Sequence, residues 1–255
     1  MNVKSASKAT RLDQRLVELG LADSRARAQA LILAGLVRVS GQVAAKAGQA
    51  VAPDAQVEVA GPDHPYVSRG GVKLAGALDR FGLEVSGMAC LDAGASTGGF
   101  TDCLLQRGAA GVVAVDVGYG QLAHKLRVDP RVTVLERVNV RYLEPEQAPG
   151  PFDLIVGDLS FISLALVLPV LATRLALGGR LLCLVKPQFE AGREQVGKGG
   201  VVREEAARLA AVERVRQCLL SLGLTVLGDC ESPITGPAGN VEYFILAAKP
   251  ESIPS

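Results

Sequence analysis

One lysine and two carboxylates of this 255-residue chain lie where strand-like segments begin or end. Asp158 in VGDLSF and Lys186 in LVKPQFE follow apolar runs, and Glu242 in GNVEYF lies at the start of the last such run. A lysine that ends an apolar run such as LLCLV is costly to bury unless it is paired. Lys73, in SRGGVKL, supplies the second amine. Such a set can move protons at a reacting centre, or it can be a buried ion-pair network without a catalytic role.

A glycine-rich turn, CLDAGASTGGFTDCLL, joins a strand-like run to a helix-like segment. Gly94, Gly98 and Gly99 can adopt backbone conformations that other residues avoid, and they let a ligand approach closely. Ser96 stands where a dinucleotide fingerprint has its second glycine, which argues against a pyrophosphate cofactor. Asp116 ends the next strand-like run, where a carboxylate can accept both ribose hydroxyls. The pattern favours an adenosine-containing ligand over an ordinary tight turn with a surface carboxylate.

Alternating strands and helices must position these side chains. Strands are predicted at 89–93, 112–117, 131–136, 153–158, 180–186, 224–228 and 241–248, and helices near 70–81, 98–107, 121–127, 163–175 and 204–221. This alternation predicts an α/β domain, with a seven-stranded parallel sheet that has helices on both faces. Ligands of such sheets bind beyond the carboxyl ends of the strands.

The first 60 residues predict a separate small α+β unit. Apolar residues at helical spacing indicate helices over 12–19 and from Asp23 or Ser24 to Gly35, followed by short strands within 37–43 and 57–59. This part has eight Lys or Arg against five Asp or Glu, whereas the whole chain has a net charge of only +1. Its interleaved basic residues are Arg15, Arg25, Arg27, Arg38 and Lys46. Taken alone, these charges are typical of a solvated face.

The stretch DSRARAQALILAGLVRVSGQVAAKAGQAV resembles the small RNA-binding fold first named in ribosomal protein S-four. In that family, two helices and a short sheet present a basic face to structured RNA. The resemblance implies an RNA-binding domain over residues 1–60. Residues 61–67 have the Gly and Pro content of a short, stiff linker, and residues 68–250 form the second domain.

The motifs LDAGASTGGFT, DVGYGQL, DLSFISL, LVKPQFE and GNVEYF together resemble the FtsJ-like ribose 2′-O-methyltransferases, most closely the TlyA family. The resemblance implies a Rossmann-like class I methyltransferase fold and S-adenosylmethionine as cofactor. It also implies ribosomal RNA or ribosomal subunits as the partner, with cytidine ribose as the acceptor. Shorter members of that family tend to modify only large-subunit RNA. This chain stops soon after the last strand-like run, so we expect a large-subunit target.

The resemblance also implies roles for single residues. In that superfamily a Lys-Asp-Lys-Glu tetrad catalyses methyl transfer, and its members match Lys73, Asp158, Lys186 and Glu242. We expect Lys186 to be the general base, because a neutral amine can take the proton of a ribose 2′-hydroxyl. Burial beside a second ammonium favours the neutral form of a lysine. Lys73 would orient the hydroxyl, and the two carboxylates would position both amines.

The same resemblance implies a set of cofactor contacts. They are Gly94, Ser96, Gly98 and Gly99 beneath the methionine part, Asp92 close by, Asp116 at the ribose and Asn139 at the adenine edge. A loop asparagine such as Asn139 is also a common turn residue.

Two segments are candidates for further contact with RNA. Phe161 follows the tetrad aspartate and can either stack on an extruded base or pack in the core. The loop EAGREQVGKGGVVRE contains Arg193, Lys198 and Arg203, which can touch phosphates or can simply be solvated.

Composition excludes several other classes of protein. The five cysteines form no CxxC pair and the two histidines have no zinc-ligand spacing, so we expect free thiols and no metal site. The first residues lack the apolar segment of a signal peptide, and the longest apolar run is too short to span a membrane, so we expect a cytoplasmic protein. Two rival hypotheses remain open. They are a membrane-active haemolysin, which needs a spanning or cationic amphipathic segment, and a non-catalytic RNA-binding factor of ribosome assembly.

Overall fold

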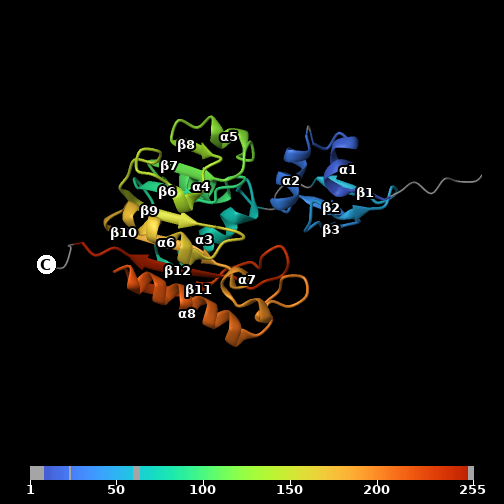
Figure 1. Ribbon diagram of the computed structural model, residues 1–255. Coiled ribbons are helices and arrows are strands. Elements are labelled where there is room, and N and C mark those ends of the chain that lie inside the picture. The colour runs from blue at the N-terminus through green and yellow to red at the C-terminus, as the bar shows by residue number, and fades with distance from the viewer. Residues whose placement is uncertain (1–8, 23, 60–63, 252–255) are drawn as a thin grey trace, which may run out of the picture.

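A computed structural model describes residues 9–22, 24–59 and 64–251, which form a small N-terminal unit and a larger α/β domain (Figure 1). Asp23, one of the two residues expected to begin the second helix, lies outside the described residues, as do residues 61–63 of the predicted linker.

The N-terminal unit contains two helices and two small sheets. Its elements are β1 (Thr10–Arg11), α1 (Leu12–Glu18), α2 (Arg25–Leu33), β2 (Val37–Val39), β3 (Gln42–Val43), β4 (Ala50–Val51) and β5 (Val57–Val59). Strands β3, β2 and β5 form one antiparallel sheet, and β1 pairs with β4, a pairing that the sequence pattern did not predict. Leu12 and Leu16 of α1 pack on Ala28 and Ile32 of α2 to form the core. The side chain of Ser24 accepts a hydrogen bond from the Arg27 amide and caps α2.

The larger domain contains one seven-stranded sheet, as the sequence predicts. Its strands are β6 (Ala89–Ala93), β7 (Gly111–Asp116), β8 (Val132–Glu136), β9 (Phe152–Gly157), β10 (Leu175–Val185), β11 (Thr225–Glu231) and β12 (Tyr243–Ala248), in the order β11-β12-β10-β9-β6-β7-β8. Its helices are α3 (Arg69–Phe81), α4 (Gly99–Gln106), α5 (His124–Arg127), α6 (Leu168–Arg174), α7 (Pro187–Glu190) and α8 (Glu205–Ser221), with short 3₁₀ turns at Val140–Tyr142, Leu164–Leu166 and Arg193–Gln195.

Alternate residues of the central strands face opposite layers of helices, as the period of a strand requires. Leu154 and Val156 of β9 pack in one core cluster with residues of α3, α4 and α5. Ile155 belongs to the other cluster, which contains residues of α6 and α8. Helices therefore cover both faces of the sheet (Figure 1).

The direction of β12 differs from the sequence-based expectation of an all-parallel sheet. β12 runs antiparallel to both β10 and β11, and its first residue, Tyr243, pairs with Val185 at the end of β10. The start of β12 therefore lies at the carboxyl edge of the parallel strands. This reversal places Glu242, just before β12, beside Lys186, just after β10.

Candidate active site

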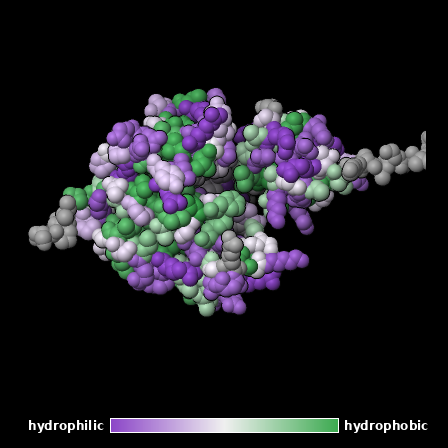
Figure 2. Space-filling view, viewed as in Figure 1, coloured by the Kyte–Doolittle hydropathy of each residue, from purple (hydrophilic) through white to green (hydrophobic). Residues whose placement is uncertain are grey.

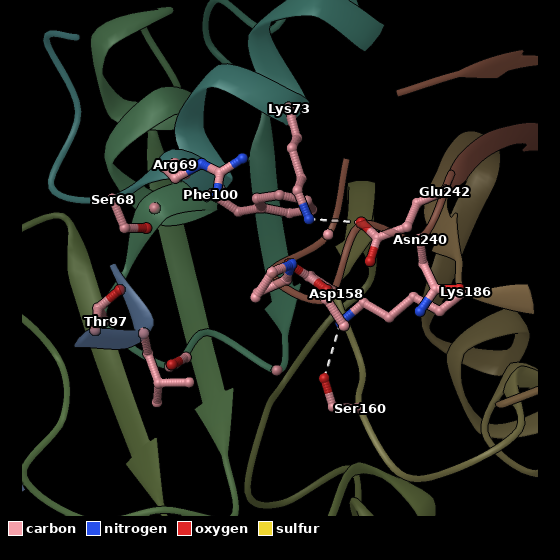
Figure 3. A pocket seen from close by; sticks show the side chains of 18 of the residues that line it. Ser68, Arg69, Lys73, Thr97, Phe100, Asp158, Ser160, Lys186, Asn240 and Glu242 are labelled. Carbon is pink, nitrogen blue, oxygen red and sulfur yellow. Dashed lines mark hydrogen bonds and ion pairs between the residues drawn. The ribbon is translucent and has the colours of Figure 1, made fainter. Parts of the chain in front are cut away.

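Four side chains of the predicted tetrad line one cavity of about 350 Å³ (Figure 3). Lys73 projects from α3, Asp158 follows β9, Lys186 follows β10 and Glu242 precedes β12. These residues are far apart along the chain. The carboxyl edge of the sheet and one covering helix bring them together.

The tetrad consists of two ion pairs. Lys73 Nζ donates to Glu242 Oε2 at 2.6 Å, with 8% and 1% of the two side chains exposed. Lys186 Nζ lies 2.5 Å from Asp158 Oδ1 and donates to Ser160 Oγ at 2.8 Å. The first pair is enclosed, and the second borders the open part of the cavity.

The charge state of Asp158 follows from its neighbours. Burial by itself would raise the pKa of this carboxyl, but the ammonium groups of Lys186 and Lys73 outweigh it and hold the pKa below the usual value. Asp158 is therefore ionised at neutral pH, and it can hold a lysine in position throughout a proton transfer.

The glycine-rich turn lies against the same cavity. Gly94, Ser96 and Gly99 line it, together with Thr97, whereas Gly98 caps α4 in a left-handed conformation with φ of 95° and does not line it. A Cβ at Gly94 would lie 2.7 Å from the carbonyl oxygen of Asp158, so only glycine fits there.

Asp92 lies beneath this turn and is fully buried. Its Oδ2 accepts hydrogen bonds from the amide and the hydroxyl of Thr101, at 2.9 and 2.7 Å, and so ties β6 to α4. Its Oδ1 has no hydrogen-bond partner in the described structure. Burial raises the pKa of Asp92 to about 7.

Asp116 ends β7 and receives two backbone amides. Its Oδ2 accepts from Ser96 N at 2.8 Å and its Oδ1 accepts from Gly118 N at 2.6 Å. With Ser96, Gln121 and other residues it encloses a second cavity of only about 10 Å³. Each carboxylate oxygen keeps lone pairs for a ribose hydroxyl, so these residues suit an adenosine group once this small cavity widens.

Asn139 is not brought to either cavity. Its side chain accepts from Arg141 N at 3.0 Å and caps the short 3₁₀ turn that follows. This is the turn role that a loop asparagine often has.

Models of two known protein families match the two parts of the chain. The model of the FtsJ-like methyltransferases matches residues 66–249, and the S4 domain model matches residues 10–57. The chain belongs to the FtsJ-like methyltransferase family.

Three relatives show how far the similarity extends. The 16S/23S rRNA (cytidine-2′-O)-methyltransferase TlyA of Mycobacterium tuberculosis is 52% identical over 94% of this chain and 90% of its own. The 23S rRNA (cytidine-2′-O)-methyltransferase TlyA of Campylobacter jejuni is 38% identical over 70% of this chain and 69% of its own. A solved structure from Streptococcus thermophilus, named as a hemolysin, is 44% identical with a TM-score of 0.75, over 96% of this chain and 90% of its own.

Phe161 of this methyltransferase is exposed to 92% and is not a core residue. Its φ of 65° is unusual for a bulky residue, and such strain is retained mainly at functional positions. The ring lies 5.2 Å from that of Phe189, and both rings line the cavity. The alternative of core packing for Phe161 is therefore wrong.

The basic residues of the N-terminal unit fall into two groups. Arg25 donates to the buried carboxylate of Asp13 at 3.0 Å, and Arg15 donates to Pro53 O at 2.9 Å. Three others are exposed, with no side-chain hydrogen bond or ion pair to the described part of the chain: Arg27, Arg38 and Lys46.

The loop after α7 is held by a buried residue that the sequence analysis did not single out. Asn240 Oδ1 accepts from Val202 N at 3.0 Å, and its Nδ2 donates to Gly200 O at 2.8 Å. Lys198 and Arg203 of this loop are exposed, whereas the side chain of Arg193 is not described.

The sequence analysis also did not predict three further residues that line the cavity: Ser160, Phe189 and Arg69. All three lie inside motifs quoted above, DLSF, KPQFE and SRGGVKL, so their closeness to the tetrad could have been inferred from the sequence. Across the described ranges, no helix has the length and apolar character to cross a membrane, and no group of three or more His, Cys, Asp or Glu is arranged to hold a metal ion.

Proposed function

We propose that this protein transfers a methyl group from S-adenosylmethionine to the 2′-oxygen of a cytidine ribose in ribosomal RNA. The observation that supports this most directly is the pair of lysine–carboxylate contacts in one cavity with the glycine-rich turn. Relatives at 52% and 38% identity are named for this reaction.

Lys186 is the proposed general base. Its Nζ borders the open cavity, and Asp158 and Ser160 hold it in place. A neutral amine there accepts the proton of the 2′-hydroxyl as the oxygen attacks. The ionised Asp158 then stabilises the ammonium group that this proton transfer forms.

Lys73 and Glu242 have a positioning role in this proposal. Their contact is buried, so the pair is held rigidly beside the reacting centre. The ammonium of Lys73 orients the ribose hydroxyl.

S-adenosylmethionine would supply an electrophilic methyl group on a sulfonium. Gly94, Ser96 and Gly99 line the cavity beside the tetrad, which suits the methionine part. Asp116 would accept the ribose hydroxyls, Asp92 and Gly98 would support the turn from behind, and Asn139 would reach the adenine edge only after leaving its present cap.

The proposed acceptor is bound by two parts of the protein. Residues 1–60 form the RNA-binding domain, 61–67 the linker and 68–250 the catalytic domain. Phe161 is proposed to stack on an extruded base, because its ring is exposed at the mouth of the cavity. Ribosomal RNA as substrate also implies a cytoplasmic location.

The proposal is tested with labelled cofactor and ribosomal RNA that lacks the modification. We expect Lys186→Ala to bind S-adenosylmethionine and RNA almost as the wild type does, while the rate of methyl transfer falls by about 10²–10⁴-fold. Asp158→Asn and Glu242→Gln should also lower the rate. Near-normal transfer by Lys186→Ala would mean that another group is the base, and no transfer by the wild type would contradict the proposed function.

A further inference from the structure

A groove leads from the active-site cavity toward the N-terminal unit. It has a volume of about 190 Å³ and shares with the cavity the residues Leu33, Arg69, Thr235, Gly236 and Pro237. The surface is hollowed between the two parts of the molecule (Figure 2). A chain that enters the cavity can therefore continue into this groove.

The walls of the groove are apolar on the side of the N-terminal unit. Leu33, at the end of α2, and Val43, at the end of β3, are exposed to 57% and 48%. Of the described residues that line the groove, none is acidic and Arg69 alone is charged. The groove thus combines an open apolar wall with a single positive charge.

Arg69 is held from both sides. Its Nη2 donates to Thr235 O at 3.2 Å, and its aliphatic stem lies against Gly35, where a Cβ would come within 2.7 Å of Arg69 Cδ. Gly35 has a φ of 74°, so a side chain there is disfavoured by both strain and space. In the described parts of the chain no carboxylate forms an ion pair with this guanidinium, which leaves donors free for a ligand.

We propose that this groove binds a nucleotide adjacent to the methylated one, with its base against Leu33 and Val43 and its phosphate on Arg69. The inference rests on the proposed function, because the target ribose in the cavity is part of a polymer whose neighbours must leave through an opening. A guanidinium binds phosphate through two parallel hydrogen bonds, and apolar side chains pack on the face of a base. The continuity with the cavity and the uncompensated charge favour this strand of RNA as the occupant.

The test uses RNA substrates in which one phosphate beside the target nucleotide is replaced by a neutral methylphosphonate. With the wild type, we expect neutralisation on one side of the target to lower kcat/KM by about 10-fold, the effect of one lost phosphate contact. With Arg69→Ala, natural RNA should show a similar loss, and the neutral linkage should then cause no further loss, because both changes remove the same contact. Arg80→Ala is the matched control, since Arg80 lies on the same helix, is exposed and lines neither cavity.

A second variant distinguishes the loss of RNA binding in the groove from a loss of folding. Val43→Asp places a negative charge in the groove at an exposed position, and it should weaken RNA binding while calorimetry shows unchanged affinity for S-adenosylmethionine. Equal losses from the neutral linkage in wild type and Arg69→Ala, or no loss in either, would overturn the inference and leave the proposed function standing. An occupant such as a peptide or a second copy of the chain would give that same result. No transfer by the wild type to any RNA would instead overturn the proposed function itself, and this inference with it.

Discussion

Lys73 and Lys186 differ in their contacts, and this difference supports the different roles proposed for them. Lys73 has one buried carboxylate as partner, whereas Lys186 is bounded by Asp158 and by the hydroxyl of Ser160. A neutral amine has two hydrogens and one lone pair. If the hydrogens of Lys186 point to Asp158 and Ser160, its lone pair must point elsewhere. The remaining direction is the open cavity, where a ribose hydroxyl would lie.

This geometry makes Ser160 a positioning residue. We expect Ser160→Ala to lower kcat by about 10-fold with little change in KM for RNA or cofactor, since the amine stays in place but loses one orienting contact. Ser160→Thr keeps the hydroxyl and should restore most of the rate. Steady-state kinetics of the three proteins provides the measurement. A change confined to KM, or no rescue by threonine, would show that Ser160 only shapes the cavity.

Asp92 gives the fold a pH dependence. Its pKa of about 7 exceeds the usual 3.8 because burial disfavours the carboxylate. The folded state therefore holds a proton between about pH 4 and 7 that the unfolded state has released. The stabilisation is complete below pH 4 and is lost as the pH rises through 7.

We expect the free energy of unfolding of the wild type to fall by about 2–3 kcal/mol more between pH 5 and pH 8 than that of Asp92→Asn, which cannot titrate. Asparagine keeps an acceptor for Thr101, so the fold should survive. Urea denaturation at the two pH values measures the difference. Asp54→Asn, at an exposed site, should behave as the wild type does. Equal pH dependence in Asp92→Asn and wild type would show that Asp92 does not titrate in this range.

At the scale of elements, the sequence was sufficient to predict the seven strands of the sheet but not the direction of β12. Six of the seven strands begin and end within three residues of their predicted bounds, because runs of apolar residues indicate buried strands, whereas β10 begins five residues earlier than predicted. The antiparallel direction of β12 left no such signal, since the hydrophobic pattern of a strand is the same in either direction. The tiny strands β1 and β4 were missed because two residues are too few to show a period.

The functional site was likewise predictable from the sequence only in part. The strand pattern was enough to place Asp158 and Lys186 at the carboxyl ends of strands, and the family resemblance added Lys73 and Glu242. Neither showed that the tetrad consists of two separate ion pairs. That split depends on distances between segments far apart in the chain. Asn139 shows a second limit of the sequence, because its motif did not indicate that its side chain caps the 3₁₀ turn that follows it.

Helix α2 contains one cation that is part of an internal network and another that is exposed to solvent. Asp13 is fully buried and receives hydrogen bonds from Arg11, Gln29 and Arg25. The hydrogen bond from Arg11 is foremost in holding the pKa of Asp13 well below its usual range. Arg25 is thus part of an internal network, while Arg27 on the same helix is exposed.

We therefore expect Arg25→Ala and Arg27→Ala to differ. Arg27→Ala should weaken RNA binding and reduce the slope of log affinity against log salt by about 1, the effect of one lost phosphate contact. Arg25→Ala should chiefly lower the stability of the N-terminal unit, by about 1 kcal/mol. Filter binding over a range of salt concentrations, together with thermal unfolding, separates the two effects. An unchanged salt slope in Arg27→Ala would mean that this face does not meet phosphates.

At the scale of the whole molecule, the N-terminal unit and the catalytic domain both line the groove beside the active site, and their surfaces differ in character. The N-terminal unit offers exposed cations, and the catalytic domain offers a cavity whose exposed aromatic ring, Phe161, stands at its mouth. A substrate that engages both must present a helical or looped RNA surface and an accessible ribose at a fixed separation. Ribosomal subunits meet this requirement, because their folded RNA holds such features rigidly apart.

The last prediction concerns which ribosomal subunit the intact protein methylates. The relative at 52% identity is named for both 16S and 23S RNA, and the relative at 38% is named for 23S RNA alone, so large-subunit RNA is common to both names. We expect methylation of a large-subunit cytidine as the main activity. The assay is transfer from labelled cofactor to purified, unmodified small and large subunits, tested separately, with Lys186→Ala as the inactive control. We expect both domains to contact folded RNA, so the large subunit should also be a better substrate than its own protein-free RNA. Labelling of the small subunit at an equal or higher rate would show that the groove and the cavity accept a wider range of RNA surfaces than this expectation allows.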